Sequence, residues 1–206
     1  MSAATIRRIE RTAIPRDTVA LARYLLGKLL VRESRAGAML GRIVETEAYL
    51  TDDPACHAYR GMTPRNRSLF LDAGHAYVYL CYGTHHLLNV SSEAEGVGCG
   101  VLLRALEPVA GAERMRRGRR SGGAAAVRTL DLARGPGRLT AALGIDSRHD
   151  GIDLFAGKAL WIGEDGTRVR RIGRSTRIGL TRGAEAPLRF FVRGSRCLSG
   201  PRRLNA

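Results

Sequence analysis

The sequence alternates two carboxylates and an aromatic ring with smaller side chains in the stretch Val44-Glu45-Thr46-Glu47-Ala48-Tyr49. Successive side chains of a β-strand point to opposite faces, so a strand here places Glu45, Glu47 and Tyr49 on one face. Val44 and the other even-numbered residues then lie on the opposite face. Carboxylates that share a buried face cost folding free energy unless they are paired, so this strand is predicted to carry a chemical site.

More chemically versatile side chains follow this stretch. His57 comes first, and then two motifs, Thr63-Pro64-Arg65-Asn66-Arg67 and Tyr77-Val78-Tyr79-Leu80-Cys81-Tyr82-Gly83. Aromatic faces attract cations, and the planar guanidinium of Arg suits phosphate. Together with the carboxylates, these residues favour a site that does chemistry on a flat, cationic ligand attached to a polyanion.

The net charge of the protein indicates that its binding partner is anionic. Lys and Arg number 34 against 19 Asp and Glu, which gives a formal net charge of +15. Such an excess points to nucleic acid or to an anionic membrane surface. Only Lys28 and Lys158 are lysines, and Arg makes bidentate phosphate contacts, which favours nucleic acid. Codon bias can explain the preference for Arg over Lys, but it does not explain the excess of positive charge.

The sequence carries no sign of a membrane or secreted protein. No run of about 18 apolar residues occurs, and the first eight residues precede no long apolar segment and do not resemble a secretory signal. The four cysteines form no CxxC pair, so reduced thiols are expected rather than a zinc site or a disulfide framework. We therefore expect a cytoplasmic protein, associated with the nucleoid if the source is bacterial. The cysteines are Cys56, Cys81, Cys99 and Cys197.

Strand-like and helix-like segments follow one another without regular alternation. Asp17 caps a predicted amphipathic helix that ends near Gly27, and further helices are predicted at residues 113–120 and 136–143. This pattern is typical of an α+β fold with a largely antiparallel β-sheet, flanking helices and a protruding β-hairpin. Strands are predicted at residues 29–31, 41–44, 76–81, 87–90, 101–106, 159–162 and 187–192.

The chain is predicted to form one domain. At 206 residues it can bury a sizeable core, and neither an internal repeat nor a linker divides residues 1–206. Flexible ends are expected at residues 1–14 and 197–206. A mobile loop is expected at residues 118–128, where Gly and Ala are concentrated.

A turn at Tyr82-Gly83-Thr84-His85 is predicted to leave Tyr82 near the tip of a hairpin. Tyr77 and Tyr79 share one face of the preceding strand, whereas Gly83 lets the chain leave the strand after Tyr82. An exposed aromatic ring at a hairpin tip of a basic protein suits a wedge between stacked bases. A tyrosine that packs in the core or on an edge strand fits the same segment equally well.

A set of motifs runs through residues 16–196 in unbroken order. The set comprises Arg42-Ile43-Val44-Glu45-Thr46-Glu47-Ala48-Tyr49, His57, Thr63-Pro64-Arg65-Asn66-Arg67, Tyr77-Val78-Tyr79 with Tyr82-Gly83, Leu102-Leu103-Arg104-Ala105-Leu106-Glu107-Pro108, Gly135-Pro136-Gly137-Arg138-Leu139 and Phe191-Val192-Arg193-Gly194-Ser195. Each motif is weak alone, but their joint order and spacing are specific. Together they resemble the alkyladenine (3-methyladenine) DNA glycosylase family, mammalian type.

The resemblance implies a DNA-repair hydrolase that flips a damaged purine out of the duplex and cuts its N-glycosidic bond, with no metal, no cofactor and no covalent intermediate. It implies 3-methyladenine, 7-methylguanine, hypoxanthine and ethenoadenine as substrates. The implied partner is double-stranded DNA containing damaged purines, bound by a monomer. The residue types fit, because a carboxylate beside the sugar can stabilise positive charge and activate water.

The resemblance also implies roles for single residues. Glu47 resembles the general base, and Arg104 and the backbone carbonyl of Ile178 resemble the other groups that hold the attacking water. Asn89 resembles the residue that discriminates against guanine, and Tyr82 resembles the intercalating wedge. The pocket for the flipped base is assigned to Tyr49, His57, Tyr79 and Asn89. Contacts to the DNA backbone are assigned to Thr63, Arg65, Arg67, Thr84, His85 and Arg138.

Some of these residues have a simpler interpretation. Glu45 is interpreted as a salt-bridged carboxylate, because the resemblance gives the chemistry to Glu47. The arginines of the backbone set also fit solvated surface charges, although Gly135-Pro136-Gly137 at a helix start suits a phosphate oxygen. A segment at residues 93–100 that is longer than the family pattern, and a loose match beside Tyr82, leave the substrate preference open.

Two other classes of protein fit part of the sequence. A non-catalytic basic nucleic-acid-binding protein would stack Tyr49 and Tyr79 on single-stranded bases and would not need Glu47. A carbohydrate hydrolase would use Glu45 and Glu47 as its carboxylate pair, but the net charge of +15 would then have no purpose.

Overall fold

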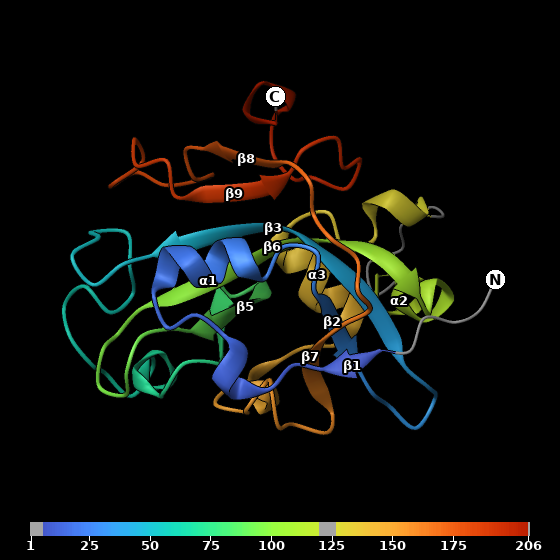
Figure 1. Ribbon diagram of the computed structural model, residues 1–206, viewed down its shortest axis with the longest axis horizontal. Helices are drawn as coiled ribbons and strands as arrows, with labels where there is room; N and C mark the ends of the chain where they lie inside the picture. Colours follow the sequence, from blue (N-terminus) through green and yellow to red (C-terminus); the bar gives the residue numbers. More distant parts are fainter. Residues whose placement is uncertain (1–5, 120–126, 206) are drawn as a thin grey trace.

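The centre of the structure is an antiparallel pair of long strands, β3 (Met39–Tyr49) and β6 (Gly100–Ala110) (Figure 1). The computed structural model describes residues 6–119 and 127–205. The other strands in these residues are β1 (Arg7–Arg8), β2 (Leu29–Arg32), β4 (Ala76–Cys81), β5 (His85–Ser91), β7 (Leu160–Glu164), β8 (Ile172–Ser175) and β9 (Arg189–Val192). They form one curled antiparallel sheet in the order β1-β7-β2-β3-β6-β5-β4, and β9 branches from β3 and pairs with β8.

Three α-helices flank the sheet in the described residues, and their ends follow from the local sequence. They are α1 (Thr18–Tyr24), α2 (Ala112–Arg119) and α3 (Pro136–Leu143). The carboxylate of Asp17 caps α1 by accepting a hydrogen bond from the backbone N–H of Ala20 at 2.7 Å. Proline begins α3, and Gly144 ends it in the left-handed conformation at φ 62°. Short 3₁₀ helices lie at Arg11–Ala13, Arg67–Phe70, Thr129–Asp131, Ser147–His149 and Arg202–Leu204.

The main hydrophobic core lies between the sheet and the helices α1 and α3. Leu21 of α1, Leu139 of α3 and Ile43 of β3 belong to the same cluster of buried side chains. In Figure 1, β8 and β9 lie on one side of the β3–β6 pair, whereas α1 and α3 lie on the other. The face of β3 and β6 that points away from α1 lies outside this core, and it carries the polar side chains of Glu45, Glu47 and Arg104.

Two irregularities in the pairing of β3 with β6 shape this polar face. Ile43 pairs with Leu106 and Glu45 with Ala105, so Val44 is an extra residue on β3; Arg104 is likewise an extra residue on β6. The bulge turns Val44 to the side of Glu45, where it packs in a small second cluster. The prediction that Val44 lies opposite Glu45 is therefore wrong, because simple alternation does not hold across a bulge.

The predicted α+β class and the largely antiparallel sheet are confirmed. The short strands β1 and β8 were not predicted. Near the ends of the described residues, Ile9 and Ile14 join the main core, and Cys197, Leu198 and Ser199 are buried. The flexibility of residues 1–14 and 197–206 stays a prediction. The predicted mobile loop at residues 118–128 falls mainly on residues 120–126, which lie outside the described residues.

Candidate active site

A cavity opens where β3, β4, β5 and β6 meet residues 178–180. Its volume is about 1120 Å³, whereas sites for small ligands commonly occupy roughly 300–1000 Å³. It therefore has room for a base together with its sugar. The lining side chains that carry polar or aromatic groups are Tyr49, Cys56, His57, Arg65, Tyr77, Tyr79, Cys81, Tyr82, Asn89 and Arg104.

Glu47 lies beneath the floor of this cavity. Its side chain is fully buried, and its carboxylate accepts hydrogen bonds from three residues of the cavity wall. The donors are the hydroxyl of Tyr49 at 3.0 Å, Nη1 of Arg104 at 3.1 Å and the backbone N–H of Ile178 at 2.8 Å. The backbone of Ile178 thus reaches Glu47 through its N–H. These three donors come from separate parts of the chain, and together they fix the orientation of the carboxylate.

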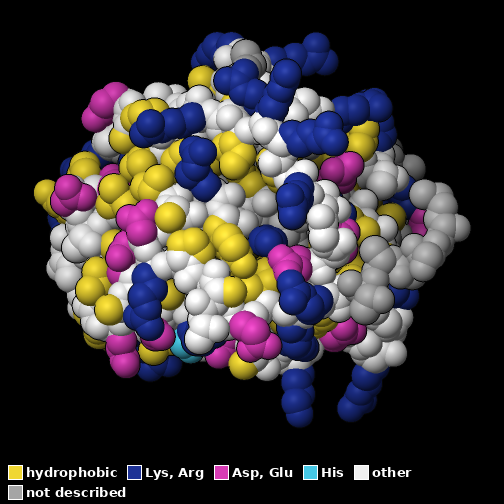
Figure 2. Space-filling model, in the orientation of Figure 1, with side chains coloured by type: hydrophobic (Ala, Val, Ile, Leu, Met, Phe, Trp, Pro, Cys, Tyr) yellow, Lys and Arg dark blue, Asp and Glu magenta, His cyan; other side chains and the backbone are white. Residues whose placement is uncertain are grey.

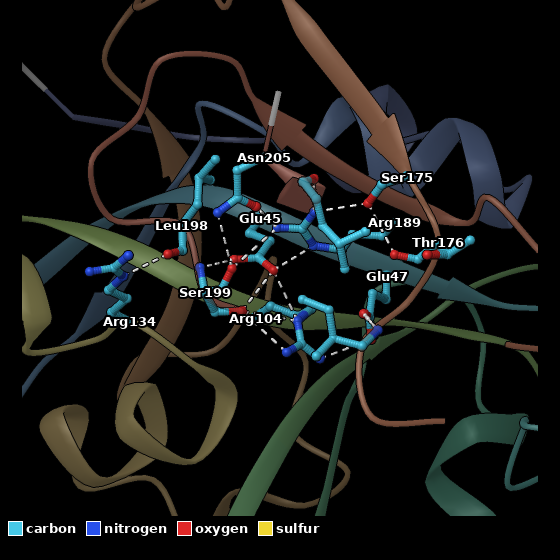
Figure 3. A network of polar contacts seen from close by, with 12 residues as sticks. Glu45, Glu47, Arg104, Arg134, Ser175, Thr176, Arg189, Leu198, Ser199 and Asn205 are labelled. Atoms are coloured by element: carbon cyan, nitrogen blue, oxygen red, sulfur yellow. Dashed lines mark hydrogen bonds and ion pairs between the residues drawn. The ribbon is translucent and has the colours of Figure 1, made fainter. Parts of the chain in front are cut away.

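Arg104 joins Glu47 to the second carboxylate of β3 (Figure 3). Its Nε donates to Glu45 at 3.0 Å, while its Nη1 donates to Glu47, and its side chain is 8% exposed. Burial lowers the pKa of Arg104, but the two carboxylates more than reverse this effect and hold the pKa above its usual value. Arg104 is therefore a fixed positive charge at the edge of the cavity.

Tyr49 lies between Glu47 and a buried ion pair. The guanidinium of Arg177 is 4.7 Å from the centroid of the Tyr49 ring, and it pairs with the carboxylate of Asp53. Arg177 also donates to the backbone carbonyl of Ala48 at 3.0 Å. Burial raises the pKa of Tyr49, and the neighbouring Glu47 raises it further, so the phenol stays protonated and remains a hydrogen-bond donor.

Three aromatic side chains form another wall of the cavity. The rings of Tyr77 and Tyr79 stack with their centroids 5.2 Å apart, which confirms that they share one face of β4. The ring of His57 lies 4.4 Å from that of Tyr79, and its Nδ1 is 2.9 Å from the hydroxyl of Tyr77. His57 keeps part of its surface exposed, but the partial desolvation of its ring lowers its pKa, as does the nearby Arg65, so the imidazole is neutral at pH 7. This wall presents flat, uncharged rings.

Asn89 reaches the cavity from β5, where it pairs with Tyr77 of β4. Its side chain is buried, and Nδ2 donates to the backbone carbonyl of Tyr77 at 3.3 Å. The amide is therefore fixed beside the aromatic wall, where it can contact one edge of a ring that stacks there.

Tyr82 occupies the tip of the hairpin formed by β4 and β5. It is 95% exposed, which excludes the alternative in which it packs in the core. Its φ of 47° is followed by a φ of 69° at Gly83, and a left-handed conformation is uncommon for a residue with a side chain. This tight turn projects the ring into solvent at the border of the cavity.

The residues assigned to the DNA backbone lie around this opening or on the exposed surface. Arg65 lines the cavity, 5.9 Å from the centroid of the Tyr79 ring, and donates to the carbonyl of Leu80 at 3.0 Å. The start of α3 packs against the hairpin, because a Cβ at Gly137 would come within 2.9 Å of the Cβ of His85. The other members, Thr63, Arg67, Thr84, His85 and Arg138, are exposed.

Positive charge is spread over the surface rather than confined to the cavity. On the face shown in Figure 2, Lys and Arg side chains gather above β8 and β9 and around the end of the chain. Among the described residues, Arg65, Arg67 and Arg138 form no ion pair with a carboxylate, so their charges are available to an anionic partner. No helix within residues 6–119 and 127–205 is long and apolar enough to cross a membrane.

Several residues of the site could not be identified from the sequence. Asp53 and Arg177 form their buried ion pair across a separation of 124 residues, and Glu45 contacts Ser199 across 154 residues. No local pattern connects partners that are so far apart. Tyr77 is different, because it could have been assigned to the aromatic wall from the sequence. It lies two residues from Tyr79 on one strand, so the two side chains share a face.

The arrangement suits hydrolysis of a bond that connects a flat ring to a sugar. A ring stacked on Tyr79 and His57 would be held by aromatic contacts and by the edge of Asn89. A carboxylate beneath the floor, with a fixed guanidinium beside it, can bind and activate a water molecule. Among the described residues no group of three or more His, Cys, Asp or Glu side chains is arranged to hold a metal ion.

Comparison with known proteins gives one consistent answer. The family model for methylpurine-DNA glycosylase matches residues 12–196. A protein of Mesorhizobium japonicum named "Putative 3-methyladenine DNA glycosylase" is 59% identical over 196 residues, covering 95% of this chain and 92% of the relative. Proteins with the same name from Paraburkholderia phytofirmans and Methanoculleus marisnigri are 52% and 47% identical, covering 94% and 89% of this chain and 89% and 94% of the relatives. These matches support the family and not the narrower mammalian type.

Proposed function

Because the chain belongs to the methylpurine-DNA glycosylase family, and is thus a DNA-repair hydrolase acting on N-glycosyl bonds, we propose that it excises damaged purines with Glu47 as general base. The observation that carries this proposal is the buried Glu47 carboxylate, held by Tyr49, Arg104 and Ile178 beneath an aromatic cavity. The proposed substrates are 3-methyladenine, 7-methylguanine, hypoxanthine and ethenoadenine in duplex DNA. The chain is proposed to act as a monomer without a cofactor.

The proposed reaction is a hydrolysis in which the purine leaves and water takes its place. Departure of the base makes the sugar resemble an oxocarbenium ion, whose positive charge the carboxylate of Glu47 stabilises. Glu47 then removes a proton from the attacking water, and Arg104 helps to hold that water. The bond between water oxygen and the anomeric carbon forms as the N-glycosidic bond breaks, and the electron pair of that bond leaves with the purine.

Base flipping delivers the purine to the cavity. The target atom cannot be reached inside the base stack, so the nucleotide must rotate out of the duplex. We propose that Tyr82 fills the vacated space, while the flipped base stacks on Tyr79, His57 and Tyr49. Cationic purines methylated on N3 or N7 are attracted to the faces of these rings. Contacts to the flanking phosphates are proposed for Thr63, Arg65, Arg67, Thr84, His85 and Arg138.

A gel assay for abasic sites tests the proposal directly. A duplex with one hypoxanthine or one ethenoadenine should acquire an alkali-labile site at that position, and the matched undamaged duplex should not. A non-catalytic binder would shift the duplex in a native gel without producing abasic sites. Absence of abasic sites on both of these lesions, with intact binding, would favour that second function.

Tyr82→Ala is expected to weaken base flipping. The ring offsets an unstacking cost of a few kcal/mol, so its loss should reduce the flipped population by about tenfold. The excision rate of complexes that are fully flipped should stay near that of the wild type. Fluorescence of ethenoadenine, which reports stacking, measures the change at saturating protein.

Tyr82→Phe, which keeps the ring, and Tyr59→Ala, at a tyrosine that is 51% exposed but does not line the cavity, are the matched controls. Both should flip the base as the wild type does. Stable flipping by Tyr82→Ala would remove the wedge role from this residue.

Asn89→Ser is expected to reduce selectivity against guanine. Guanine differs from hypoxanthine by a 2-amino group, which a buried amide at this position would reject. The smaller side chain should raise excision of mispaired guanine relative to hypoxanthine by about tenfold. Single-turnover rates on the two bases give the ratio, and the hypoxanthine rate serves as the internal control. An unchanged ratio would show that another group discriminates.

A further inference from the structure

Glu45 is a buried carboxylate for which the proposed reaction has no direct use. Its side chain is fully buried beside Glu47 on the polar face of β3. Burial raises its pKa, but the guanidinium groups of Arg104 and Arg189 more than reverse this effect, so the pKa lies below its usual value and Glu45 is charged. It accepts hydrogen bonds from Nε of Arg104 at 3.0 Å, Nε of Arg189 at 2.7 Å and the hydroxyl of Ser199 at 2.8 Å.

Arg189 is the largest fully buried side chain in the described residues, and the end of the chain supplies most of its partners. Besides Glu45, it donates to the carbonyl of Leu204 at 2.8 Å and to Oδ1 of Asn205 at 2.6 Å. Figure 3 shows Asn205 and Ser199 converging on Glu45 and Arg189. A buried guanidinium without such acceptors would be strongly destabilising, so residues 199–205 complete the network.

The end of the chain is also anchored by contacts other than those to Arg189. Nε of Arg134 donates to the backbone carbonyl of Leu198 at 2.7 Å, and Cys197 and Leu198 are buried against the side of β3 that carries Val44. The backbone N–H of Ser199 donates to Glu45 at 2.6 Å. The C-terminal segment therefore forms one wall around Glu45 and not a loose tail.

The network is a chain of alternating charges that ends at the proposed general base. It runs from Glu47 through Arg104 and Glu45 to Arg189, with two negative and two positive groups. Arg104 faces Glu45 with Nε and Glu47 with Nη1, so Glu45 decides how the guanidinium fork is turned. The positive charge of Arg189 partly cancels the negative charge of Glu45. The positive electrostatic potential that Arg104 produces at Glu47 is therefore opposed less strongly by Glu45.

We propose that Glu45, Arg189 and residues 199–205 are a positioning device that sets the orientation of Arg104 and the field at Glu47. This inference rests on the proposed function, because it assumes that Glu47 is the general base. None of these residues contacts the reacting atoms, so they act through the orientation of Arg104 and through the field of their charges at Glu47. The C-terminal segment, residues 199–205, then supports catalysis by holding the charged groups beside Glu47 in place.

Other groups also contribute to the field at Glu47. Tyr49 faces it from β3, Arg104 from β6, Tyr79 from β4, and Arg177 with the N–H of Ile178 from the segment after β8. Of these groups Arg104 contacts Glu45 directly, whereas a change of charge at Glu45 or Arg189 leaves the others in place. The pH dependence of excision then reports the change in the network.

Two variants that remove charges of opposite sign test the proposal, because they should shift the pH profile in opposite directions. The acid limb of the pH profile for single-turnover excision reports protonation of the general base. Glu45→Gln removes a negative charge and should move this limb to lower pH by about one unit. Arg189→Gln removes a positive charge and should move it to higher pH by a similar amount. The double variant restores the balance of charge and should bring the limb back toward that of the wild type.

Ser199→Ala covers the case in which a charge variant does not fold. It removes the hydroxyl that contacts Glu45 and also accepts from Arg104 Nη2 at 3.2 Å, but it leaves every charge in place. Excision at saturating protein should fall by about tenfold, with the acid limb and the affinity for the duplex unchanged. Truncation after Pro201 removes the acceptors at Leu204 and Asn205 and should move the acid limb in the same direction as Arg189→Gln.

Glu185→Gln is the matched control, because Glu185 is an exposed carboxylate four residues from Arg189 and undergoes the same change of charge. It should leave the profile unchanged. Acid limbs that stay in place, or that move in the same direction for Glu45→Gln and Arg189→Gln, would overturn the positioning role. Failure of the proposed function is a separate result: the wild type would not excise, or Glu47→Gln would excise normally.

Discussion

Glu47→Gln is expected to bind lesion-containing duplex as the wild type does and to release the base at least ~10²-fold more slowly. The amide keeps the shape of the side chain, and its single oxygen can still accept from Tyr49 and Arg104, which share one oxygen of Glu47. Its NH2 group then replaces the oxygen that accepts from the N–H of Ile178, and the amide cannot take a proton from water. It also removes the negative charge that stabilises the sugar as the base departs. The measurement is single-turnover excision of hypoxanthine at saturating protein, together with the affinity for the same duplex.

Glu95→Gln is the control for this experiment, because Glu95 is exposed and does not line the cavity. It should excise at the rate of the wild type. Excision by Glu47→Gln within a few-fold of the wild type would show that Glu47 is not the base. Lost binding together with lost excision would instead indicate that the amide disturbs the cavity, and a crystal structure of the variant would settle that point.

Asp53→Ala is expected to lower the free energy of unfolding by about 3–5 kcal/mol, because it leaves the buried guanidinium of Arg177 without its counter-charge. Both side chains of this pair are nearly inaccessible, at 0% for Arg177 and 5% for Asp53. For a chain of this size the loss corresponds to a fall in melting temperature of roughly 10 °C. Urea unfolding followed by circular dichroism measures it.

The neighbouring carboxylate provides the control for stability. Asp52 is exposed, and Asp52→Ala should change the unfolding free energy by no more than about 0.5 kcal/mol. A loss below about 1 kcal/mol in Asp53→Ala would mean that the carbonyls of Ala48 and Gly183 are sufficient partners for Arg177. Because Arg177 lies against Tyr49 and precedes Ile178, the same variant should also disturb the groups that hold Glu47.

The two carboxylates of β3 differ in their surroundings although they look equivalent in sequence. Glu45 is enclosed by two arginines and Ser199, whereas Glu47 contacts one arginine, a phenol and a backbone N–H at the cavity floor. The interpretation of Glu45 as a salt-bridged carboxylate is confirmed by these contacts. The role of Glu47 stays a proposal, which the variants above test.

The sequence by itself determined the features that depend on neighbouring residues. Alternation in residues 44–49 predicted the strand with Glu45, Glu47 and Tyr49 on one face, and the contacts of all three confirm it. The cap at Asp17 predicted the start of α1, and Gly83 predicted the turn that exposes Tyr82. Each of these features depends on the alternation of side chains along a strand, on a hydrogen bond within one turn, or on a backbone angle. All three depend only on residues that are close in sequence.

Only the tertiary structure decided which distant groups meet at the site. The bulge at Val44 depends on how β3 pairs with β6, and the partners of Glu45 come from β6, β9 and the end of the chain. A buried charge must find its opposite wherever the fold brings one, and Arg189 lies 144 residues from Glu45. Burial makes these pairs obligatory, but it acts through space, so no local pattern in the sequence could identify them.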